Sequence, residues 1–377
     1  MIVRSTSYLM AAILPLLLFH WFAPADIGQI DFWLLWLVAM IVVALPMIFA
    51  EIALAYRSGQ TPSSGMQILT READASVLWR SFSWLAALVA MLIAALAVSD
   101  ASSGLQLALG DWGVAFSVPT FALSAGLMVI ALMLSLLGAG TLPVGLILMI
   151  IGLALGLLGG LPHWQFAMTE VSLAEWGRAV ALALVSVGAG TGIYWFAYYA
   201  TFNRSIEATH HSDSPAQSRS AAGLHRSSKQ VLPIWGLQLI AGLAALLLSG
   251  LSLPPLGKLF YLIGVLCVSA YLLYYAGEQV KVKFGLVMSL VLVLALSILM
   301  AALLPTAWLV ILLVIISSVA ALLLSVFAGW QMKISHLRKS LNFSNEAFYN
   351  LWRVAIRIAV PLAMILALVG WISEWLG

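Results

Sequence analysis

Apolar stretches of about twenty residues recur along the whole chain, and they constrain its fold more than any other feature of the sequence. A helix needs about 20 predominantly apolar residues to cross a bilayer, and lipid offers no hydrogen-bond partners to an open sheet edge. The sequence therefore predicts an all-α integral membrane protein. Eleven spans are expected near residues 7–23, 32–56, 82–108, 114–138, 141–161, 178–202, 231–252, 257–277, 284–304, 307–330 and 353–373.

The composition excludes several classes of protein. Of the 377 residues, 63% are hydrophobic and 8% are charged, whereas a soluble domain carries about 25% charged residues. So few charges cannot cover a water-facing surface, which excludes a soluble enzyme and a nucleic-acid-binding protein. The sequence also contains no nucleotide-binding loop, metal signature or nucleophile motif. We therefore predict no enzymatic activity, no cofactor and no metal site.

The distribution of Lys and Arg predicts the orientation. With a cytoplasmic N-terminus, only Arg178 and Lys258 of the 17 basic residues lie outside. Cytoplasmic loops of membrane proteins carry such an excess, so the bias favours eleven spans and a periplasmic C-terminus. The predicted location is the plasma membrane, as a multi-pass protein of a bacterial inner membrane surrounded by its lipid bilayer.

Two segments of the sequence have features that membrane spans do not explain. Residues 1–25 also have the parts of a cleavable signal peptide, with Arg4, an apolar stretch and Ala23-Pro24-Ala25 as a cleavage-like site. Cleavage would not change the orientation of later spans, so the charges leave this open. Residues 203–230 are rich in Ser, His and Arg without apolar periodicity, which predicts a flexible cytoplasmic loop.

The first ten spans can be divided into two sets of five, about 7–161 and about 178–330, in a single membrane domain. An extra helix follows at about 353–373. Transporters built in this way often bind their substrate where one helix of each repeat is interrupted near the bilayer midplane. Spans 1 and 6 would be the equivalent pair.

Both of these spans contain residues that disturb a helix. Pro15 lies midway along span 1, and span 6 contains Ser186 followed by Gly188, Gly190 and Gly192. Glycine raises backbone freedom, so this stretch could unwind and offer its peptide groups to a ligand. Small residues also permit close helix packing, and the spacing does not separate the two interpretations.

Two acidic residues lie inside predicted spans, where an unpaired charge costs at least a few kcal/mol. Glu51 follows Pro46 in span 2, and we expect it to pair with a buried hydrogen-bond donor in a structural role. Asp100 lies toward the outer end of span 3. It either lines an aqueous vestibule or is an ordinary acid of the outer loop.

Four motifs, in order along the chain, resemble the neurotransmitter:sodium symporter family in its eleven-helix bacterial branch. Residues 45–54, with Leu-Pro followed by Glu-Ile-Ala-Leu, are similar to the family's second helix, and residues 186–198 to its broken sixth helix. Residues 327–330 resemble the end of its tenth helix and residues 351–361 the start of its eleventh. The resemblance implies the leucine-transporter fold, with two inverted five-helix repeats plus an eleventh helix and with span 1 retained. It also implies sodium-driven import of amino acids or related small molecules.

The sodium ligands of that family are missing at the matching positions. Its first helix carries Gly-x-Gly-Asn-x-Trp-Arg-Phe-Pro, whereas residues 13–21 here read Ile-Leu-Pro-Leu-Leu-Leu-Phe-His-Trp. The family's substrate-contacting Tyr falls at Ala97, and its second sodium-binding pair falls at Tyr271 and Leu272. A hard cation needs several oxygen ligands. Sodium binding is therefore supported by the resemblance alone, and we do not expect the family's usual coupling of transport to sodium.

Two functions remain open at this point. The first is a divergent secondary transporter of a small organic solute, amino-acid-like or more apolar. Its candidate substrate-binding residues are Ser186, Gly188, Gly190, Pro15 and Ala97, and its candidate coupling or structural charges are Glu51 and Asp100. The second is a transport-inactive scaffold, or accessory subunit, that partners another membrane protein and whose site is closed by leucines 16–18.

Overall fold

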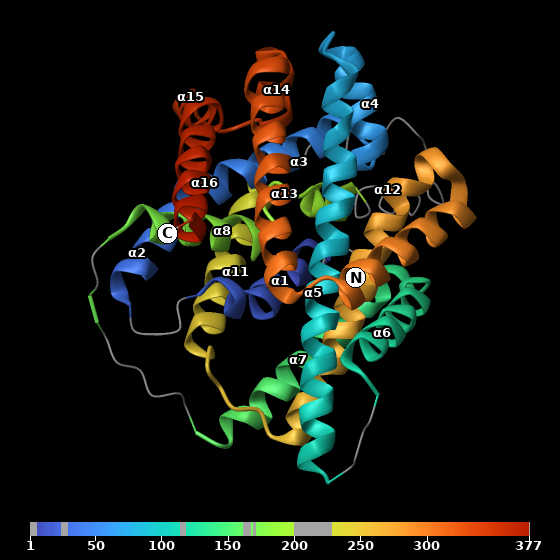
Figure 1. Cartoon of the computed structure of the whole chain (residues 1–377). Coiled ribbons are helices and arrows are strands. Elements are labelled where there is room, and N and C mark those ends of the chain that lie inside the picture. Colours follow the sequence, from blue (N-terminus) through green and yellow to red (C-terminus); the bar gives the residue numbers. More distant parts are fainter. Residues whose placement is uncertain are drawn as a thin grey trace, which may run out of the picture.

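The computed structural model describes residues 6–23, 29–113, 118–160, 167–168, 171–199 and 228–376 (Figure 1). Most of the predicted loop at 203–230, Arg4, and Pro24 and Ala25 of the cleavage-like site lie outside the described residues. Within the described ranges the chain is built from helices, as the sequence predicts. The α-helices are α1 (Thr6–Phe22), α2 (Ile30–Ala39), α3 (Leu45–Ser58), α4 (Pro62–Glu72), α5 (Ser81–Asp111), α6 (Thr120–Ser135), α7 (Thr141–Leu157), α8 (Leu173–Val185), α11 (Ser228–Leu247), α12 (Pro255–Leu303), α13 (Thr306–Val326), α14 (Ile334–Leu341), α15 (Glu346–Val354) and α16 (Val360–Leu376).

Several of these helices are long enough to span a membrane. Seven helical segments in the described part of the chain combine the required length with an apolar composition. They are Ile30–Ser58, Val77–Asp111, Gly138–Leu157, Ser228–Leu247, Pro255–Leu303, Thr306–Gln331 and Glu346–Ser373, and α1 and α6 are shorter apolar helices. The chain is therefore a multi-pass membrane protein. The count of eleven spans and the division into inverted repeats stay predictions.

Short π-helical and 3-10 turns join or interrupt the longer helices. The π-helical turns are η2 (Met40–Ala44), η5 (Phe327–Gln331) and η6 (Ala355–Ala359), and the 3-10 turns are η3 (Val77–Arg80) and η4 (Gly138–Gly140). Turn η2 precedes Pro46, which has no N–H to donate to the helical ladder. In α12, Gly285 has φ 77° and ψ 176°, so this helix consists of two parts that meet at one residue.

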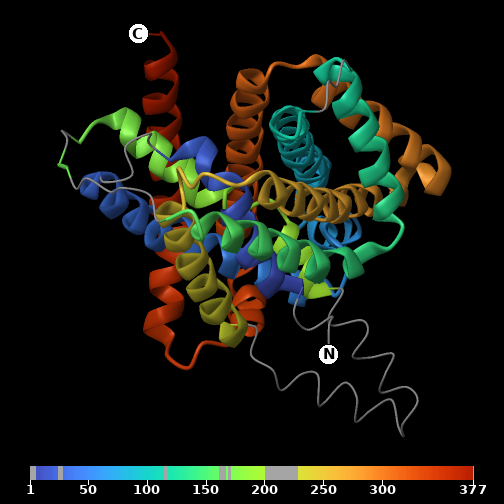
Figure 2. The same ribbon diagram turned by 90° about the horizontal axis from the view of Figure 1, so that it is seen from below.

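Part of the bundle packs around α5, and the remaining helices pack against one another. Helices α12 and α13 both lie against α5, and α12 also covers α6 and α7. Helix α8 packs against α16, α2 and α13, and α1 packs against α11. In Figure 2, α15 and α16 form one long red rod, and the α14–α15 connection lies at its lower end. The candidate functional site lies in the interior of this bundle.

The polar segment after span 2 contains a helix that the sequence analysis did not predict. Helix α3 ends at Ser58 and is followed by Gly59, whose φ of 59° is the left-handed conformation usual after a helix. Helix α4 then starts at Pro62, a favoured first helical residue. The backbone N–H of Ser63 donates to the side-chain oxygen of Gln279 on α12 at 2.8 Å, which ties α4 to the bundle.

Candidate functional site

The helix that carries the predicted glycines is interrupted in the middle of the bundle. Helix α8 ends at Val185, residues 186–192 are not helical, and residues 193–199 are helical again. Gly188, Gly190 and Gly192 have φ values of 72°, 77° and 77°, a backbone conformation that other residues rarely adopt. The alternate glycines therefore unwind the chain here, close to Leu14 of α1, Ala321 of α13 and Tyr275 of α12.

Glu51 of α3 reaches this interruption with a fully buried side chain. Its Oε1 accepts a hydrogen bond from the N–H of Gly190 at 2.5 Å, and its Oε2 accepts one from the N–H of Trp195 at 3.2 Å. The start of a helix leaves N–H groups without intrahelical partners, and a negative charge is favourable there. Glu51 thus caps the second helical stretch from a separate element of the fold.

Side chains from two further helices satisfy carbonyl groups of the interruption. The hydroxyl of Tyr194 donates to the carbonyl of Val187 at 2.6 Å. The Nε2 of Gln238, on α11, lies 2.7 Å from the Tyr194 hydroxyl and 3.3 Å from the Val187 carbonyl. The hydroxyl of Tyr275, on α12, donates to the carbonyl of Thr191 at 3.1 Å. This network makes the unwound backbone stable with the chain's own groups.

Sequence reasoning missed Gln238 and Tyr275 as parts of this site. Each is a polar residue inside a predicted span, and a polar group inside a span is costly unless it has a partner. That signal marks such a residue as important but does not identify the group with which it pairs. Gln238 is fully buried, and its Oε1 has no hydrogen-bond partner among the described residues.

Helix α1 passes the interruption without unwinding. It is helical from Thr6 to Phe22, through Pro15. Leu14 lies directly on the interruption, because a Cβ added to Gly188 would be 2.6 Å from the Leu14 Cδ1 atom. The next turn is fixed to α12, where the Tyr261 hydroxyl donates to the carbonyl of Leu16 at 2.9 Å. Spans 1 and 6 therefore differ, because span 6 is unwound at residues 186–192 whereas α1 is a continuous helix.

The other candidate site residues do not all belong to the interruption. Ser186 belongs to the interruption, and its hydroxyl donates to the carbonyl of Leu182 within α8. Pro15 is buried next to Leu14 on α1, and Ala97 is buried on α5. Asp100 lies further along α5 with a side chain that is 46% exposed, and its Oδ2 is 3.6 Å from the Nε2 of His20 on α1.

The residues at the positions of the family's sodium sites do not fit this ion. Leucines 16–18 offer hydrocarbon side chains, and their backbone belongs to the continuous helix α1. On α12, Tyr271 and Leu272 are buried, and the Tyr271 hydroxyl has no hydrogen-bond partner in the described part of the chain. These groups do not form the cage of oxygen ligands that would offset desolvation of a cation. Nor do the described residues include a cluster of three His, Cys, Asp or Glu side chains able to hold a metal ion.

No protein-family model matches the chain, and no curated protein matches it. Among solved structures, the chain is similar to the crystal structure of MhsT in complex with L-phenylalanine, with a TM-score of 0.64. The two sequences are 14% identical, and the match covers 98% of this chain and 98% of that chain. At this identity the likeness shows the fold alone. The chain is thus an all-helical membrane protein with the fold of MhsT.

Proposed function

We propose that this chain is a divergent secondary transporter of a small organic solute, amino-acid-like or more apolar, that works without the sodium sites of the family it resembles. The observation that carries the proposal is the interruption at residues 186–192 within a fold similar to that of MhsT, a protein crystallised with L-phenylalanine. Interrupted helices inside the membrane are the usual binding places in transporters of repeat architecture.

The surroundings of the interruption favour a largely apolar solute. Leu14, Val187 and Ala86 supply hydrocarbon from α1, the interruption and α5, and all three are buried. The unpartnered Oε1 of Gln238 is a buried acceptor in the same region. A buried acceptor without a partner costs about 1–3 kcal/mol, which a donor on the solute would recover. We therefore infer that an N–H or O–H group of the solute binds Gln238.

Solute entry requires a movement of α1. Leu14 covers Gly188 in the structure, so the solute reaches the interruption only when α1 separates from it. Rocking of one helix bundle against the other supplies such a movement in transporters of this architecture. Coupling in this proposal is to protons, through Asp100 or Glu51, or is absent.

Uptake into proteoliposomes tests the proposal. The full chain is reconstituted and offered a panel of radiolabelled aliphatic and aromatic amino acids and amines, with an inward sodium gradient, an inward proton gradient or neither. We expect saturable uptake of at least one solute, with no increase from the sodium gradient, and a higher half-saturation concentration in Gln238→Leu. Empty liposomes are the control. Absence of binding and flux for the whole panel under every gradient contradicts transport, and sodium-driven uptake contradicts the loss of sodium coupling.

A second function is favoured by the seal between α1 and the interruption. Leu14 contacts Gly188, and Leu17 and Leu18 are buried on the same helix. Because these leucines close the interruption to a solute, the chain is also suited to act as a transport-inactive scaffold for another membrane protein. Purification from native membranes distinguishes the two functions. A partner present in a fixed ratio supports the scaffold, whereas a lone chain with saturable solute binding contradicts it.

A further inference from the structure

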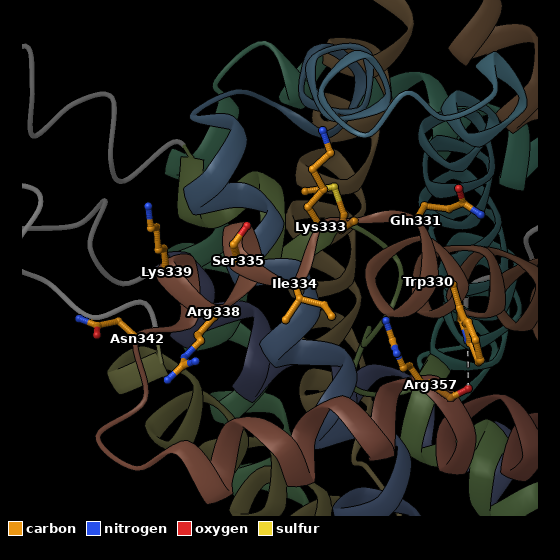
Figure 3. Close-up of a pocket in the computed structure, with 10 residues that line it drawn as sticks. Trp330, Gln331, Lys333, Ile334, Ser335, Arg338, Lys339, Asn342 and Arg357 are labelled. Atoms are coloured by element: carbon orange, nitrogen blue, oxygen red, sulfur yellow. Dashed lines mark hydrogen bonds between the residues drawn. The ribbon is translucent and has the colours of Figure 1, made fainter.

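A basic pocket lies where η5, α14 and η6 meet, and none of residues 186–192 lines it (Figure 3). Its volume is about 970 Å³. Its charged lining residues are the cations Lys333, Arg338, Lys339 and Arg357, and no carboxylate is among the described residues that line it. Figure 3 shows the side chains of α14 on one side of the pocket and Arg357 on the other. Such a lining fits an anion.

Arg357 is held in place before any ligand arrives. Its Nε donates to the carbonyl of Gly329, and its guanidinium carbon lies 5.0 Å from the centre of the Trp330 ring. The indole N–H of Trp330 donates in turn to the carbonyl of Arg357 at 3.4 Å. A fixed guanidinium presents paired N–H donors, the geometry that suits the oxygens of a phosphate group.

The cations of α14 are available to an anionic ligand. Arg338 lies 2.9 Å from the carboxylate of Glu346, and the side chains of both residues are more than half exposed. An exposed pair of this kind contributes about 0–1 kcal/mol, so an incoming phosphate can compete for the arginine. Lys339 and Arg357 pair with no carboxylate in the described part of the chain.

The surroundings of the pocket indicate that this anion belongs to a lipid. Trp330 is 58% exposed and Ile334 is 42% exposed at its border, and exposed tryptophans are typical of the membrane interface. An apolar groove of about 680 Å³ includes Phe343, the residue that follows Asn342 of the basic pocket, together with Phe348 and Leu351. The distribution of basic residues predicts that this end of the molecule is cytoplasmic, where basic pockets between membrane helices bind acidic headgroups.

We propose that the basic pocket binds the phosphate headgroup of an anionic phospholipid from the cytoplasmic leaflet, with an acyl chain in the apolar groove. Arg357 and Lys339 contact the phosphate from opposite sides, and Arg338 turns from Glu346 to join them. The inference is independent of the proposed transport, because it concerns a different surface and predicts lipid binding whether or not the chain moves a solute.

Thermal stability of the purified full chain in detergent, with native mass spectrometry, tests this inference. Phosphatidylglycerol is expected to raise the Tm and remain bound in the mass spectrum, whereas phosphatidylcholine and inorganic phosphate are not. The double variant Arg338→Gln/Lys339→Gln should lose at least half of that rise. Arg357 is left intact because it also holds η5 to η6.

The matched control is Lys281→Gln/Lys283→Gln, which removes two exposed cations at the same predicted face outside the pocket. It should keep the full rise in Tm. If the first double variant does not fold, the single change Lys339→Gln takes its place and should reduce the rise. An equal rise with phosphatidylcholine or with inorganic phosphate alone overturns the proposal, as does an unchanged rise in the pocket variant that folds.

Discussion

Glu51 and Gly190 are joined by a hydrogen bond from the backbone N–H of the glycine to the carboxylate of the acid, across 139 positions of sequence. Both groups are buried, and the second carboxylate oxygen accepts the N–H of Trp195. Two donors freed by the unwinding of one helix are thus satisfied by a side chain from another. This arrangement joins α3 to the interruption and stabilises the break.

The change Glu51→Gln tests that role. Glutamine has nearly the same volume but one acceptor oxygen, so its amide NH₂ group would face a backbone donor. We expect a loss of about 1–3 kcal/mol, the cost of one unsatisfied buried donor, seen as a lower Tm of the purified protein. Glu278→Gln is the control, because Glu278 is part-exposed and pairs with Lys281 at 3.1 Å. An E51Q protein with the wild-type Tm would show that the carboxylate does not stabilise the interruption.

Two glycine substitutions should have opposite effects. A Cβ added to Gly190 would lie 2.5 Å from the Cβ of Ala321, and φ at this position is 77°. We expect Gly190→Ala to cost more than about 2 kcal/mol from backbone strain and overlap. Gly236, on α11, has nothing within 4 Å of an added Cβ, so Gly236→Ala should gain about 0.5–1 kcal/mol from helix propensity.

Size-exclusion chromatography and the Tm of each glycine variant measure these effects. Gly190→Ala should give little monodisperse protein or a clearly lower Tm, and Gly236→Ala should match or exceed the wild type. Similar stability of the two variants would contradict the tight packing described for residues 186–192.

The helical class and most helix positions could be predicted because, in lipid, apolar length is a direct signal of a helix. The span predicted at 82–108 corresponds to α5, Ser81–Asp111, and the one at 32–56 to the segment Ile30–Ser58. Helix α4 could not be predicted in the same way. It is short and polar, and it is held by a contact between Ser63 and Gln279, which are 216 positions apart.

The site could be predicted in part. The alternate glycines indicated a place where the helix of span 6 could unwind, because their spacing leaves few side chains to support a helix. Pro15 was ambiguous, since a proline in a membrane helix is tolerated where neighbouring groups satisfy the backbone. The structure keeps α1 helical through Pro15. The pairing of Gln238 with Tyr194 depends on tertiary contacts that no local pattern encodes.

Leu14→Ala should affect solute binding more than Leu18→Ala, an equivalent change on the same helix. It removes the side chain that covers Gly188 and leaves a cavity, which costs about 2–5 kcal/mol in a packed core. Leu18 is equally buried on the same helix, so Leu18→Ala should lower the Tm by a similar amount. Only Leu14→Ala should change the solute concentration that gives half-maximal stabilisation. The same shift of that concentration in both variants would contradict a solute site at Leu14.

Asp100 offers a test of proton coupling at the outer end of α5. Its Oδ2 lies 3.6 Å from the Nε2 of His20, and both side chains are nearly half exposed. An exposed pair contributes about 1 kcal/mol or less. We therefore expect Asp100→Asn to leave the Tm within a few degrees of the wild type while it removes the stimulation of uptake by an inward proton gradient.

The control for this prediction is Asp111→Asn, at the last residue of the same helix. Asp111 is also part-exposed and pairs with Lys258 at 2.9 Å, so the change removes a comparable carboxylate and a comparable ion pair. Uptake into proteoliposomes, with and without a proton gradient, is measured for both variants. Asp111→Asn should retain the stimulation because its carboxylate faces Lys258 rather than α1. An equal response of the two variants would show that protons do not couple through the His20–Asp100 pair, and it would leave Glu51 as the other candidate for proton coupling.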